Sequence, residues 1–226
     1  MRITTMPTDH LATLRLLTWL SPSFPVGAFS YSHGLEYAVH DGAVTSRRHL
    51  AEWISDLITE GSFRNDAILL AEAWHAAAGD DLARLRHVAE QAEAMALSSE
   101  RHLETMDQGR SFIAAARAWI TRPEWDFAMP YPVAVGAVAG TMKISLDSIC
   151  LAYLHAAAAN LVAAAIRLVP LGQSEGTAVM ASLEYLIIAT ARMAAGSSLA
   201  DLGSATFIAD MAAMRHERLD VRLFRS

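Results

Sequence analysis

The sequence contains very few of the residues on which several common kinds of site depend. It has one cysteine, Cys150, so it can form no internal disulfide and no paired-cysteine zinc site. It has one lysine, Lys143, which leaves a single candidate for an amine nucleophile. The net charge is −6, and the basic residues are scattered, which argues against a nucleic-acid binder. With no secretory signal layout in residues 1–10, the scarcity of cysteine favours the cytoplasm.

Motifs for catalysis and metal binding are also missing. Residues 136–145 hold two glycines and Lys143, but not at the spacing of a phosphate-binding loop. There is no Gly-x-Ser-x-Gly motif for a nucleophilic serine. A dinuclear site in a helical bundle needs two Glu-x-x-His pairs, and only Glu72 with His75 is present. We therefore expect no catalytic residue, no metal site and no cofactor.

What the sequence does contain is a strongly helical composition. Hydrophobic residues make up 53% of the chain, and 43 residues are alanine. Apolar side chains recur at helical spacing, whereas no alternating strand pattern of useful length occurs. We predict an all-α, single-domain helical bundle of about eight to ten helices spanning residues 1–226. Thr8 or Asp9 is expected to cap the first helix, and another helix is expected from Leu82 onward. The other expected helices cover about 35–41, 46–60, 65–78, 99–120, 133–142, 145–169, 175–195 and 207–214.

One predicted helix has the length of a membrane span. The run from Ser148 to Ile166 is free of charge over 19 residues, but it is mostly alanine and contains His155 and Asn160. We expect a buried bundle helix here and no membrane association, with a membrane component as the alternative. The mean hydropathy of +0.25 predicts more apolar surface than a monomer of this size hides, and hence a homodimer.

Two segments have the composition of contact surfaces. Residues 21–34 combine two prolines, two glycines and four serines with three aromatic residues, which favours an ordered loop packed on the bundle. Residues 204–226 form a predicted partner-binding C-terminal tail, whose last twelve residues interleave arginine with apolar side chains. We expect residues 215–226 to be poorly ordered until a partner binds. A solvated terminus is the alternative.

Several stretches, taken together and in order, resemble the UreF family of urease accessory proteins. They are Ser-Pro-Ser-Phe-Pro-Val-Gly-Ala-Phe-Ser-Tyr-Ser-His-Gly-Leu-Glu at 21–36, Met-Asp-Gln-Gly-Arg-Ser at 106–111, Asn-Leu-Val at 160–162 with Arg-Leu-Val-Pro-Leu-Gly-Gln at 167–173, Met-Arg-His-Glu at 214–217 and Arg-Leu-Phe-Arg-Ser at 222–226. Residues 65–91 and 121–131 match no motif.

The resemblance implies a non-enzymatic, all-α protein that dimerises, binds UreD (also called UreH) and recruits UreG. The assembly serves nickel insertion into apo-urease, the urease apoprotein. A scaffold that passes nickel onward must release it, which weak and sparse ligands allow. The nickel cation binding that the family implies is therefore compatible with a chain that has no His or Cys cluster.

The resemblance also implies partner-binding residues, in three motifs and one further element. The first motif, for UreG or the dimer, contributes Tyr31, Gly34 and Glu36, and the second contributes Arg167, which could instead only complement a helix dipole. The third, for UreD, contributes Arg215, His216, Arg222, Leu223, Phe224, Arg225 and Ser226, and the Gly-Arg-Ser element contributes Arg110. The alternative function is a helical enzyme with His33, Glu36 and Arg110 in one pocket. His33 and Glu36 are also candidates for transient nickel ligands.

Overall fold

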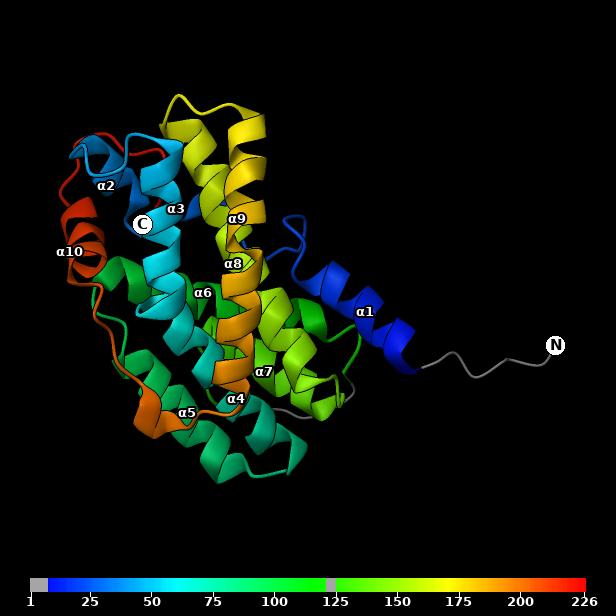
Figure 1. Ribbon diagram of the computed structural model, residues 1–226. Helices are drawn as coiled ribbons and strands as arrows, with labels where there is room; N and C mark the ends of the chain where they lie inside the picture. Colours follow the sequence, from blue (N-terminus) through cyan, green and yellow to red (C-terminus); the bar gives the residue numbers. More distant parts are fainter. Residues whose placement is uncertain (1–7, 121–124) are drawn as a thin grey trace.

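The computed structural model describes residues 8–120 and 125–226, which form the helical body in Figure 1. Over these ranges the chain contains helices and no β-strand, so the predicted all-α fold is confirmed. The elements are α1 (Thr8–Trp19), η1 (Ala28–Ser30), α2 (Leu35–His40), α3 (Arg47–Thr59), α4 (Ser62–Ala78), α5 (Leu82–Ala94), α6 (Ser99–Ala116), α7 (Tyr131–Thr141), α8 (Leu146–Leu168), α9 (Gln173–Ala195), η2 (Leu199–Asp201) and α10 (Phe207–His216). The unassigned insert 121–131 is described only from residue 125.

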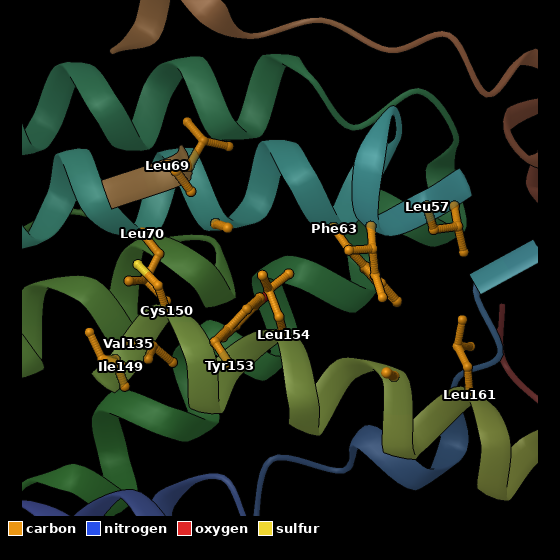
Figure 2. Packing of buried hydrophobic residues seen from close by; sticks show 14 of the residues in the cluster. Leu57, Phe63, Leu69, Leu70, Val135, Ile149, Cys150, Tyr153, Leu154 and Leu161 are labelled. Carbon is orange, nitrogen blue, oxygen red and sulfur yellow. The ribbon is translucent and has the colours of Figure 1, made fainter. Parts of the chain in front are cut away.

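Helix α4 lies at the centre of the fold. It packs against α3, α5, α7, α8 and α9, and its apolar side chains are buried on several sides. Figure 2 shows Leu70 of α4, Val135 of α7 and Cys150 of α8 within the same apolar cluster. A helix that is apolar on more than one face needs neighbours all round, which explains its central place.

Two glycines allow α7 to approach α4 closely. A β-carbon at Gly136 would overlap the carbonyl oxygen of Leu70, and one at Gly140 would overlap that of Trp74. At the end of the same contact the indole Nε1 of Trp74 donates to the carbonyl of Ile144 at 2.8 Å. The glycines that partly match a phosphate-binding loop therefore serve helix packing.

Side-chain caps fix several helix starts where the sequence predicts them. Ser46 accepts a hydrogen bond from the amide of His49, and Ser98 accepts one from the amide of Arg101. The largest differences from the predicted bounds are at α4 and α6, and the other helix ends lie within two residues of prediction. Helix α4 starts at Ser62, three residues early, and α6 ends at Ala116 because the chain then closes a turn onto the Ala116 carbonyl.

The alanine-rich segment that matches a membrane span forms α8. By length and composition alone, α8 and α9 could each cross a membrane. Half of the apolar window of α8 is buried inside the fold, including Ile149, Leu154 and Leu161. This burial is what a core helix of a bundle requires.

Helix α1 projects from one side of the body (Figure 1). Its anchor is Trp19, a fully buried side chain that packs edge-on against Phe112 and Trp119. By contrast, Leu14 and Leu17 of the apolar stripe on α1 are 57% and 68% exposed. The stripe is thus a surface feature of this chain and contributes little to its core.

Candidate functional site

The loop of residues 21–34 packs on the helical body, as its aromatic content predicts. Phe24, Val26 and Tyr31 are buried, and η1 forms its middle turn. Gly34 ends the loop with φ of 75°, a left-handed value that favours glycine. A β-carbon there would lie 2.6 Å from the backbone nitrogen of Ala213, so this glycine also admits α10 beside α2.

The last ten residues, 217–226, which we call the terminal segment, fold back onto this loop. The amide of Ser32 donates to the carbonyl of Ser226, and the amide of Arg225 donates to the carbonyl of Ser30, each at 2.7 Å. Phe224 is 4% exposed and Ser226 is 1% exposed. The expectation that residues 215–226 are poorly ordered in the single chain is therefore wrong. The folded chain itself buries Phe224, whose ring packs against the Arg167 guanidinium of α8.

A buried polar cluster joins the terminal segment to α2 and α6. The two oxygens of Glu36 accept the amides of Leu223 and Phe224 at 2.7 and 3.0 Å. His216, at the end of α10, is fully buried, with Nε2 at 2.9 Å from Glu36 and Nδ1 at 2.7 Å from Glu100. The other oxygen of Glu100 pairs with the guanidinium of Arg222. The contacts described here for Glu36, His216 and Arg222 are all within the chain, where these residues hold the terminal segment on α2 and α6.

A second polar cluster lies beneath the end of the terminal segment, around Glu104 of α6. Its carboxylate is within 2.8 Å of His33 Nδ1 and 2.7 Å of an Arg101 nitrogen, and it accepts the Ser226 hydroxyl at 2.7 Å. Burial raises the pKa of Glu104, but the charges of Arg101 and His33 and the hydrogen bonds from His33 and Ser226 outweigh it, so the pKa falls to about 2. Glu104 is thus an ionised, buried anchor.

A neighbouring carboxyl on α4 behaves in the opposite way. Burial raises the pKa of Asp66, an effect only partly offset by Arg101, by His33 and by the hydrogen bond from the Tyr153 hydroxyl. Two carboxyl groups around Arg101 therefore have pKa values shifted in opposite directions.

The remaining predicted residues gather near the same surface with one exception. The Arg167 guanidinium lies 4.6 Å from the Phe224 ring centre, and that of Arg225 lies 5.7 Å from the Tyr31 ring centre. Arg110 pairs with Asp107 at 3.3 Å and lines a shallow hollow with Tyr31 and Arg225. The exception is Arg215, which has an exposed side chain on the last turn of α10.

The three residues of the alternative enzyme do not converge. His33 pairs with Glu104 and Glu36 pairs with His216, whereas Arg110 is on the surface. Of the three, only His33 lines the cavity of about 330 Å³ between the loop and α8. Both oxygens of Glu36 bind structural partners, and Glu36 does not line this cavity.

No group of three or more His, Cys, Asp or Glu side chains suited to a metal occurs in residues 8–120 and 125–226. Glu72, half of the Glu-x-x-His pair, is buried and pairs with Arg84 at 2.7 Å. His33 and Glu36, the candidate nickel ligands, pair with different partners.

Among the residues of this site that sequence reasoning missed, Glu100, Arg101 and Glu104 lie together on α6. They lie on the first turns of α6, where acidic and polar residues are common at a capped helix start. Because their partners Arg222 and Ser226 are 122 residues away from Glu100 and Glu104, no local spacing marks them.

Comparisons with known proteins agree with the motifs that meet here. The family model UreF matches residues 44–184, more than half of the chain. The chain is 53% identical to "Urease accessory protein UreF 1" of Brucella anthropi over 99% of both sequences. It is 49% identical to "Urease accessory protein UreF" of Rhodopseudomonas palustris, over 95% of this chain and 93% of the relative. The chain therefore belongs to the UreF family of urease accessory proteins.

Proposed function

We propose that the protein is a non-catalytic scaffold in the assembly that inserts nickel into apo-urease. In this proposal it binds UreD (UreH) and UreG in the cytoplasm, as a homodimer. Nickel is the cargo of the assembly, and its contact with this chain is transient. A homodimer is supported by apolar side chains that the single chain leaves exposed, such as Leu17 on α1 and Tyr185 on α9.

The observation that carries the proposal is the outer face of the docked terminal segment. Val221 and Leu223 are 84% and 62% exposed, and Phe29 of the neighbouring loop is 66% exposed. The backbone hydrogen bond between Arg225 and Ser30 ties the two segments together. Two segments that lie far apart in the sequence thus contribute to one exposed face, which we call the loop-tail surface (Phe29, Val221, Arg222, Leu223 and Arg225).

The chemistry of this surface suits a protein partner. It combines apolar side chains with the guanidinium groups of Arg222 and Arg225, a combination enriched among the residues that dominate binding energy. The buried face of the same segment is held by hydrogen bonds and ion pairs, so the exposed groups are already positioned. Preorganisation of this kind lowers the entropy cost of association.

Leu223 is exposed whereas its neighbour Phe224 is buried, so a substitution of Leu223 changes the exposed surface and leaves the buried anchor in place. We expect Leu223→Ala to leave the fold intact and to weaken co-purification of UreD by about tenfold or more, as for an interface anchor. Leu82→Ala, on the exposed surface of α5, is the matched control and should retain UreD fully.

The assay is a pull-down from cells that express the urease accessory set, with thermal denaturation of each variant measured in parallel. If Leu223→Ala retains UreD and UreG at wild-type yield, the loop-tail surface is not the binding surface. Titration of the isolated chain with nickel tests the second part of the proposal, since sub-micromolar affinity would contradict transient contact.

A further inference from the structure

The His216 side chain contacts both glutamates of the cluster that holds the terminal segment. Its Nε2 faces Glu36 of α2 at 2.9 Å, and its Nδ1 faces Glu100 of α6 at 2.7 Å. The imidazole is fully buried, so water cannot substitute for either contact. The terminal segment begins directly after it.

Both ring nitrogens of His216 face glutamate oxygens that also have other partners. Glu36 accepts two backbone amides, and Glu100 pairs with the guanidinium of Arg222, so both glutamates act as carboxylate acceptors. With a hydrogen on each ring nitrogen, both contacts are hydrogen bonds to carboxylate oxygens, and the ring is then an imidazolium. Two negative and two positive side chains leave the cluster neutral, whereas a neutral imidazole would leave one buried charge uncompensated. The C-terminal end of α10 also favours a positive charge.

We infer that His216 is a positively charged latch: it bridges Glu36 and Glu100, and loss of its charge releases the terminal segment from the 21–34 loop while the helical body stays folded. Glu36 is the connecting element. The same carboxylate that pairs with His216 accepts the amides of Leu223 and Phe224, so the imidazolium orients the acceptor on which the segment docks.

The test uses hydrogen exchange of the full-length chain. In His216→Gln, one carboxylate faces the amide oxygen of the new side chain and loses its donor. We expect the Leu223 and Phe224 amides to exchange about 100-fold faster, as for a broken buried ion pair, while the α4 core amides exchange as in wild type. His155→Gln, an exposed histidine on α8, is the control and should change neither set.

A double-mutant cycle isolates the contact between His216 and Glu100. Glu100 also pairs with Arg222, so Glu100→Gln is measured alone as well as combined with His216→Gln. Because the two residues share one contact, exchange of the Leu223 and Phe224 amides in the double variant should accelerate by less than the product of the two single accelerations. If the two accelerations multiply, or if the core amides of His216→Gln accelerate equally, the charged latch is refuted.

A measurement on the unmodified chain keeps the inference testable even if the variants fold poorly. Nitrogen-15 NMR of the His216 ring should show hydrogen on both ring nitrogens at neutral pH, and one bare ring nitrogen would overturn it. A consequence for partners rests on the proposed function: release of the segment disorders the loop-tail surface and weakens UreD binding. If exchange responds as expected but UreD binding does not, the latch stands and the proposed binding surface fails.

Discussion

Replacement of Glu104 by glutamine should make the free energy of unfolding depend less on pH between 7 and 3. In the folded chain the pKa of Glu104 is lowered from 4.5 to about 2, because Arg101, His33 and the Ser226 hydroxyl outweigh the effect of burial. A carboxylate with a lowered folded pKa stabilises the fold above its unfolded pKa and loses this effect as the pH falls toward its folded pKa. The shift corresponds to about 3 kcal/mol at pH 7, and more than half of it is lost by pH 3.

The assay is urea denaturation of wild type and Glu104→Gln at several pH values between 7 and 3. We expect the variant to be about 3 kcal/mol less stable at pH 7 and the difference to shrink steadily as the pH falls. A constant difference between the two proteins over the whole range would refute the reasoning, since a packing defect does not titrate.

Asp66→Asn supplies a control of opposite sign. The pKa of Asp66 is raised, chiefly by burial, so its ionised form opposes folding at high pH and the fold gains stability as this carboxyl takes up a proton. The stability of Asp66→Asn relative to wild type should therefore decrease as the pH falls, whereas that of Glu104→Gln should increase.

Three further predictions concern the helical body. Gly136→Ala should lower the free energy of unfolding by about 1–3 kcal/mol because its β-carbon would overlap the α4 backbone. The control, Gly203→Ala, places its β-carbon in open space and should change this free energy little. Differential scanning calorimetry compares the two variants with wild type. Trp19→Ala should cost about 3–5 kcal/mol in urea denaturation, and Leu17→Ala less than about 0.5 kcal/mol, because only the tryptophan is buried; equal effects would contradict the position of α1. Ser46→Ala should cost about 1 kcal/mol through loss of the cap on α3, and a thermal midpoint identical to wild type would show that the cap contributes nothing.

The positions of the polar clusters follow from tertiary structure and not from composition. The same short stretch of α6 provides Glu100 for the terminal segment and Glu104 for the loop, one turn apart on one face. Because both carboxylates meet positive partners from other elements, each helps to hold the loop and the terminal segment beside each other.

The amino-acid sequence by itself determined the helical class, most helix starts and the family. Helical periodicity and caps act within a few residues, so Thr45 or Ser46 and Ser98 or Ser99 mark the starts of α3 and α6 without knowledge of the fold, and the structure selects Ser46 and Ser98. The motifs at 21–36 and 222–226 were recognisable for the same reason, since each is a short local pattern.

Only the tertiary structure decided what those motifs do to one another. Glu36 and His216 are 180 residues apart, and nothing in their local spacing shows that they pair. The order of the terminal segment was predicted wrongly because a short segment in isolation cannot compensate for its lost chain entropy. In the folded chain Phe224 is buried beside the Arg167 guanidinium of α8, and Glu36 satisfies two of the segment's backbone amides. The free energy that orders the segment therefore comes from contacts that exist only once the helices are packed.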